Sequence, residues 1–158
     1  MLKRTNLPSA HAVIRGGNGY PALNGSATFL QTPKGVLVTV EVKGLPKNEV
    51  CSDGIFALHI HEGENCTGTA VDEFSDAKTH FNPDNCQHPY HSGDLPPLIG
   101  NNGYAYMSVL TNRFTLGQII NRVIVVHGGK DDFSSQPSGN SGTKIGCGMI
   151  VKNCRTKP

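Results

Sequence analysis

The feature that most constrains the fold is the alternation of side chains in VLVTVEVKG, residues 36–44. Valine occupies every second position from 36 to 42, and threonine, glutamate and lysine lie among the residues between. Successive side chains of a β-strand point to opposite faces, so the pattern predicts a half-buried strand. Upstream, SATFLQ (26–31) places Ala27 and Phe29 on one face, and TPKG (32–35) is predicted to join the two runs as a four-residue hairpin loop.

Further strands are expected where short apolar runs alternate with loops rich in glycine, proline and asparagine. These runs are residues 11–16, 54–62, 104–111, 122–128 and 143–152. No ten-residue segment has a helical stripe, and LGQIIN (116–121) is too short for more than one turn. The pattern predicts an antiparallel all-β sandwich or barrel, with residues 1–158 as one domain. Two long connections, at about 63–103 and 128–142, are expected to be functional, since long structureless loops usually are.

Composition limits the class of partner. Charged residues make up 16% of the chain, the formal net charge is +2, and no run of lysine and arginine exceeds two residues, so nucleic acid is not an expected partner. No apolar run approaches the ~20 residues that span a bilayer. The N-terminal MLKRTNLPSAHAVI lacks the apolar region of a secretory signal. The expectation is a soluble, cytoplasmic protein.

Histidines mark the ends of predicted strands. In ALHIHE, His59 and His61 are two residues apart on a strand, so their side chains share one face, roughly 6.5–7 Å apart along it. That separation allows both imidazoles to reach one metal ion. His127 ends another predicted strand, VIVVH, whereas His11 is expected to be a surface histidine without a role.

The loop segment HFNPDNCQHPYHSGD, residues 80–94, has no apolar period and fits neither helix nor strand. Its His80, His88, His91 and Asp94 offer three nitrogen ligands and one oxygen ligand, a set that suits tetrahedral Zn²⁺. A segment without a core of its own can be folded by a bound metal. The sequence therefore predicts a metal centre in this loop.

Five motifs, in order and in register, resemble those of copper/zinc superoxide dismutases over about residues 11 to 151. They are HIHE (59–62), HFNP (80–83), HSGDL (91–95), VVHGGKDD (125–132) and GNSGTKIGCG (139–148). The loop lengths resemble the bacterial branch of that family. The resemblance implies an eight-stranded antiparallel Greek-key sandwich or barrel of immunoglobulin-like architecture with two long functional loops, and it favours a homodimer.

The resemblance also implies one copper ion and one zinc ion per chain. The implied copper ligands are His59, His61, His80 and His127. The implied zinc ligands are His80, His88, His91 and Asp94. His80 would then be shared as an imidazolate, with one ring nitrogen directed at each metal.

Other positions gain roles through the same resemblance. Asp131 matches a carboxylate that bridges a copper-binding and a zinc-binding histidine. Its neighbour Asp132 is interpreted as a solvated acidic residue in a turn. Cys66 and Cys147 match an intrasubunit disulfide. Lys144 stands where the family has an arginine that attracts the substrate, so it keeps the charge but loses the planar two-pronged donor. Three cysteines have no counterpart: Cys51, Cys86 and Cys154.

The implied activity is conversion of superoxide to dioxygen and hydrogen peroxide by alternate reduction and oxidation of copper. His80 and Lys144 are the candidate catalytic residues, the first for proton delivery and the second for attracting the anion. Two alternatives stay open at this point. One is a non-catalytic homologue that carries copper or acts as a metal-binding decoy, and the other is a structural sandwich whose metals only stabilise the fold.

Overall fold

A computed structural model describes residues 7–47 and 54–153. Two of the cysteines without a family counterpart, Cys51 and Cys154, lie outside these residues. The described residues form ten strands, one short α-helix and one 3-10 turn, η1. Their bounds are β1 (Ser9–Gly16), β2 (Asn24–Thr32), β3 (Gly35–Lys43), β4 (Ile55–Phe56), β5 (Leu58–His61), η1 (Ser75–Ala77), β6 (Leu98–Ile99), β7 (Tyr104–Thr111), α1 (Leu116–Ile119), β8 (Val123–His127), β9 (Lys144–Met149) and β10 (Val151–Lys152).

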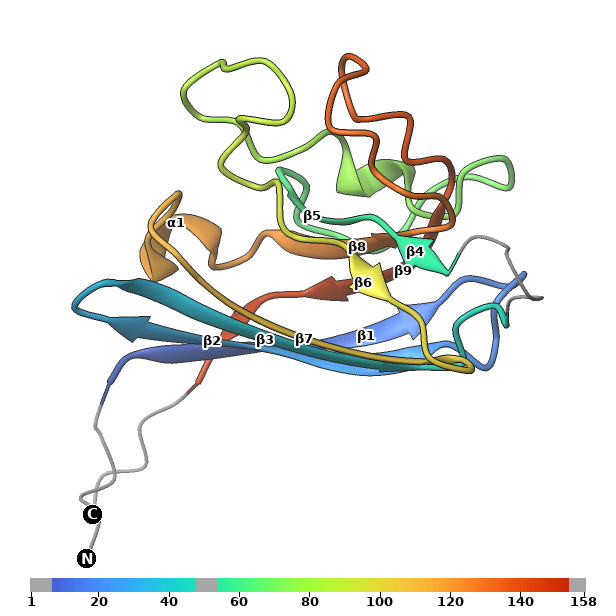
Figure 1. The fold of residues 1–158 in the computed structure, drawn as a ribbon, viewed down its shortest axis with the longest axis horizontal. Helices are drawn as coiled ribbons and strands as arrows, with labels where there is room; N and C mark the ends of the chain where they lie inside the picture. The colour runs from blue at the N-terminus through green and yellow to red at the C-terminus, as the bar shows by residue number, and fades with distance from the viewer. Residues whose placement is uncertain (1–6, 48–53, 154–158) are drawn as a thin grey trace, which may run out of the picture.

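The sheet confirms the predicted all-β, eight-stranded fold. One antiparallel sheet has the order β5-β8-β9-β1-β2-β3-β7, with β10 beside β1, and β4 pairs with β6 in a separate small sheet. The large sheet curls so that β5, β8 and β9 lie over β1, β2, β3 and β7 (Figure 1). The apolar core fills the space between these two layers because each strand turns its apolar face inward, including all four alternating valines of β3.

The hairpin between β2 and β3 is tighter than predicted. Thr32 and Gly35 are already paired, so only two residues connect the strands instead of four. The Thr32 hydroxyl donates to the Gly35 carbonyl oxygen at 2.8 Å, and Gly35 has a φ of +135° that a residue with a side chain rarely adopts. A glycine and a short polar side chain thus extend the pairing of β2 and β3 into the predicted loop.

The predicted strand 54–62 is wrong as a single element. It divides at Ala57 into β4 and β5, which belong to different sheets. The amide of Ala57 donates to the Gly129 carbonyl, and its carbonyl accepts from the His127 amide. These bonds to the end of β8 redirect the chain, because a buried backbone group must find a partner.

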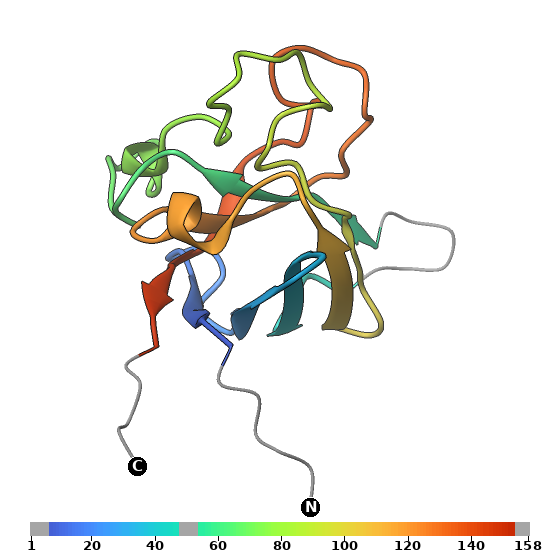
Figure 2. The ribbon, with the colours of Figure 1, turned by 90° about the vertical axis from the view of Figure 1, so that its left-hand side faces the viewer.

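Both long loops lie on the same outer side of the β5–β8–β9 layer. Figures 1 and 2 show residues 62–97 and 128–143 gathered there, away from β1, β2, β3 and β7. The strands that carry the three strand histidines, β5 and β8, run directly beneath these loops. Among the described residues, no helix has the length and apolar character needed to cross a membrane.

Candidate metal centre

Strand pairing brings the predicted strand histidines together. His59 and His61 lie on β5, which is antiparallel to β8, and His127 ends β8. The loop then adds His80 through a backbone bridge to His61, and it adds Asp94 through a bridge to His59. Residues far apart in the sequence therefore converge because two neighbouring strands and one loop share hydrogen-bonded positions.

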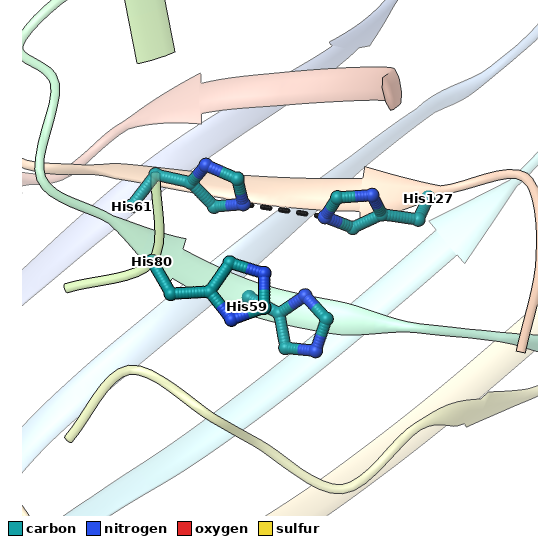
Figure 3. A group of neighbouring side chains, drawn as sticks. All are labelled: His59, His61, His80 and His127. Atoms are coloured by element: carbon teal, nitrogen blue, oxygen red, sulfur yellow. Dashed lines mark hydrogen bonds between the residues drawn. The ribbon is translucent and has the colours of Figure 1, made fainter. Parts of the chain in front are cut away.

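Four buried imidazoles form the first group, the four-histidine cluster (His59, His61, His80 and His127). Their closest ring nitrogens all lie within 4.8 Å of one another. The Nε2 atoms of His61 and His127 face each other at 3.2 Å, and the rings of His59 and His80 lie beside them with centroids 3.9 Å apart (Figure 3). The arrangement directs several nitrogens at one common point.

The second group, the three-histidine–aspartate cluster, contains His80, His88, His91 and Asp94. Asp94 lies 2.8 Å from His80 Nδ1, 3.1 Å from His88 Nδ1 and 3.4 Å from His91 Nδ1. His80 Nδ1 and His91 Nδ1 are 3.3 Å apart. Ligand atoms at 2.0–2.1 Å from a tetrahedral zinc are separated by roughly 3.3 Å, so these spacings fit that coordination.

Asp131 determines which ring nitrogen carries the hydrogen in one histidine of each cluster, His59 and His88. Its two carboxylate oxygens lie 2.8 Å from His59 Nε2 and 2.8 Å from His88 Nε2. Burial alone would raise the pKa of Asp131, but hydrogen bonds from His59, the Phe133 amide and His88 hold it at about 2. An ionised carboxylate only accepts hydrogen bonds, so both Nε2 atoms carry hydrogen. Lone pairs are then left on Nδ1 of His59 and of His88, and these buried atoms have no hydrogen-bond partner.

Backbone carbonyls orient the other two strand histidines, His61 and His127. His61 Nδ1 donates to the Lys78 carbonyl oxygen at 2.9 Å, and His127 Nδ1 lies 3.3 Å from the Gly142 carbonyl oxygen. A carbonyl cannot donate, so the lone pair of His61 is on Nε2. The Ser141 hydroxyl also lies 3.3 Å from His127 Nδ1, and a hydrogen on that Nδ1 directed at Gly142 leaves the His127 lone pair on Nε2, the atom that faces His61 Nε2. His80 Nε2 is also buried without a partner. Lone pairs that converge in this way are the expected arrangement around a cation.

Burial keeps the three strand histidines, His59, His61 and His127, neutral and able to ligate. It lowers the pKa of His127 to about 3, with nearby His59 adding to the effect. It also holds the pKa of His61 well below its usual range, and His127 contributes. Burial lowers the pKa of His59 as well, although the bond to Asp131 opposes the shift. Neutral imidazole is the ligating form, so these three donors fit a metal without prior deprotonation.

Asp131 is predicted to determine metal affinity. In Asp131→Asn, the amide would place an N–H against one of the two Nε2–H groups, which favours moving that ring's hydrogen to Nδ1, the metal-facing atom. We expect binding of copper or zinc to weaken about 10- to 100-fold, the usual effect of losing such a partner. Competition with a chromophoric chelator measures both affinities.

The matched control is Asp132→Asn. Asp132 is exposed and accepts hydrogen bonds from Ser134 and Ser135, as a turn acid would, and it touches neither cluster. The Asp132→Asn variant should bind both metals as tightly as the unaltered chain. Equal affinities for both variants would show that Asp131 does not set the hydrogen positions.

An open cavity of about 820 Å³ gives access to the four-histidine cluster. Its wall includes His61, His80 and His127 together with Lys144. Lys144 thus lies where the predicted substrate-attracting cation should be, but its Nζ is 2.5 Å from the carboxylate of Asp72. Sequence reasoning missed Asp72, because it lies 72 residues from Lys144 and has no motif around it.

The predicted disulfide is present. Cys66 and Cys147 are bonded, with their Cα atoms 5.6 Å apart and their sequence numbers 81 apart. The bond ties the loop before η1 to β9, beside the cavity wall. Cys86, in the loop between His80 and His88, is a free and exposed thiol.

Comparisons with known proteins agree with this site. A sequence model described as copper/zinc superoxide dismutase matches residues 23–150. The Cu-Zn superoxide dismutase of Legionella pneumophila is 34% identical over 138 residues, which cover 82% of this chain and 79% of that protein. Superoxide dismutase 1 (Cu-Zn) of Aquifex aeolicus is also 34% identical, over 80% of this chain and 79% of its own length.

A solved structure extends the similarity to the fold. Cu/Zn superoxide dismutase from Brucella abortus superposes with a TM-score of 0.76 at 25% sequence identity, covering 90% of this chain and 99% of that chain. The family match spans most of the described residues, and both histidine clusters lie within it. On this evidence, the chain belongs to the copper/zinc superoxide dismutase family.

Proposed function

We propose that this chain is a superoxide dismutase that binds copper and zinc. In the reaction, two superoxide ions and two protons yield one dioxygen and one hydrogen peroxide. The observation that carries the proposal is the sharing of His80: its Nε2 belongs to the open four-histidine cluster and its Nδ1 to the three-histidine–aspartate cluster. The family relationship supports the same activity.

The donor sets support an assignment of the metals. The three-histidine–aspartate cluster has the ligand types and the spacing of a closed tetrahedral zinc site. The four-histidine cluster offers only imidazole nitrogens, which suit copper, and three of its histidines, His61, His80 and His127, line the open cavity. We therefore propose copper on His59, His61, His80 and His127, and zinc on His80, His88, His91 and Asp94.

The chain's own residues supply orientation and protons. When bound, copper supplies the one-electron chemistry, and zinc adds positive charge without redox change. His80 can hold a proton at Nε2 and deliver it to the peroxide product, while its Nδ1 stays directed at the other cluster. Asp131 keeps His59 and His88 in the orientation that ligation needs. Lys144 is a candidate for attracting the anion from the cavity wall.

Metal content and turnover should be measured on one sample. Mass spectrometry is expected to give one copper and one zinc per chain, and stopped-flow decay of superoxide should be fast and should stop after removal of copper with a chelator. The copper-carrier or decoy alternative makes the opposite prediction. Both metals bound in full, with superoxide decay no faster than in buffer, would establish that alternative and contradict a dismutase.

We also propose that two chains associate. Family membership favours a homodimer, and β7 at the end of the large sheet exposes apolar side chains: Tyr104 (37%), Tyr106 (60%) and Leu110 (49%). Clustered exposed apolar groups are typical of contact surfaces. Light scattering should give the mass of two chains, and the mass of one chain would contradict the proposal.

A further inference from the structure

The wall of the cavity carries a charge pair at the position expected for a free cation. Lys144 Nζ donates to Asp72 Oδ2 at 2.5 Å, and the exposed fractions of the two side chains are 17% and 41%. Lys144 is thus largely enclosed, and its ammonium group is paired with the carboxylate of Asp72. Both residues line the cavity above the four-histidine cluster.

Asp72 is held rigidly in place to make this contact. Its Oδ1 accepts from the Phe74 amide at 3.1 Å, and its carbonyl accepts from the amides of Thr69 and Ser75. One carboxylate oxygen therefore fixes the turn, and the other holds Lys144. The Cys66–Cys147 disulfide ties the same loop to β9, the strand that begins at Lys144.

The other charges on the cavity wall do not restore a positive field. Besides Asp72, the wall includes the carboxylates of Glu62 and Glu73, and Lys78 is its second lysine. Burial works to raise the pKa of Asp72, but the hydrogen bonds from Lys144 and the Phe74 amide, together with the charge of Lys144, outweigh it and lower that pKa, so Asp72 is ionised at neutral pH. An ion pair acts on a distant anion as a dipole, whose attraction falls off faster with distance than that of a single charge.

We propose that Asp72 is a positioning residue that holds Lys144 against the cavity wall and offsets its attraction for a small monovalent anion. This inference rests on the proposed function, because the anion meant is the substrate of the four-histidine cluster. It follows that anion attraction in the unaltered chain is weak and depends little on salt. It also follows that removal of the Asp72 charge leaves the positive charge of Lys144 uncompensated, so that Lys144 attracts the anion more strongly.

Asp72→Asn is the informative variant, because the amide oxygen can still accept from Phe74 while the negative charge is lost. We expect kcat/KM for superoxide to rise about threefold to tenfold at low ionic strength, within the range known for electrostatic steering. The gain should disappear near 0.5 M salt, where screening is strong. Asp76→Asn is the control: Asp76 lies in the same loop and bonds to Thr67, but it is outside the cavity wall, so kcat/KM should not change.

Azide binding provides a readout without turnover. Visible absorption of the copper-loaded protein reports the azide Kd, which should fall about threefold to tenfold in Asp72→Asn. In a Lys144→Gln background the same change should alter the Kd by less than twofold, since the effect passes through Lys144. Azide affinity remains measurable even if the loaded chain does not dismute superoxide, so failure of the proposed function is recognised separately.

Three results would overturn the inference. Unchanged azide affinity and salt dependence, with a lower melting temperature, would make Asp72–Lys144 a tether and nothing more. A full effect of Asp72→Asn in the Lys144→Gln background would mean that Asp72 acts by its own charge. A weaker azide affinity in Asp72→Asn would mean that the ion pair assists the anion instead of opposing it.

Discussion

Replacement of His80 by alanine is expected to lower kcat/KM for superoxide by on the order of 100-fold or more, since a positioned proton donor alone contributes about 10²–10⁴-fold. His80 offers Nε2 to one cluster and Nδ1 to the other, so its loss removes a donor from both at once. Both metals should therefore bind more weakly. Stopped-flow decay of superoxide and chelator competition for each metal measure the two effects.

Two comparison variants make this test specific. His88→Ala removes a nitrogen donor that belongs only to the three-histidine–aspartate cluster, so it should weaken zinc binding far more than copper binding. His11→Ala changes a histidine that contacts Asn153 and belongs to neither cluster, and it should behave like the unaltered chain. Full activity and full copper affinity in His80→Ala would contradict the shared role.

Loss of the Cys66–Cys147 disulfide is expected to cost about 4–5 kcal/mol of the free energy of unfolding, by the chain-entropy relation for a loop of this length. For a domain of this size the melting temperature should fall by roughly 10–15 °C. The reason is that the bond removes conformations from the unfolded chain, most of all when it closes a long loop. Thermal unfolding of Cys66→Ser, followed by circular dichroism, measures the change.

Cys86→Ser is the matched control, because Cys86 is exposed and unbonded. The melting temperature of this variant should stay within about a degree or two of that of the unaltered chain. Reduction of the unaltered chain should reproduce the loss seen in Cys66→Ser. If Cys66→Ser and the control melted at the same temperature, the disulfide would contribute no net stability.

Local patterns in the sequence determined much of the fold. The alternation of valines in β3 and the short apolar runs elsewhere predicted the strands, because the inward face of a strand is decided residue by residue. The exceptions are places where distant backbone groups intervene. Ala57 divides a predicted strand because its hydrogen bonds go to Gly129 and His127, which no local pattern around residue 57 reveals.

The residues of both clusters were also visible in the sequence, since histidines two apart on a strand, together with histidines grouped in a loop without a core, indicate a metal site. Their hydrogen positions were decided only by tertiary structure, where Asp131 contacts one ring in each cluster. The net charge that the cavity wall presents was also decided only by tertiary structure. Lys144 has the charge expected from its motif, but it is paired with Asp72, 72 residues away. Spacing along the chain identifies which groups can ligate, whereas packing between distant loops sets their protons and their net charge.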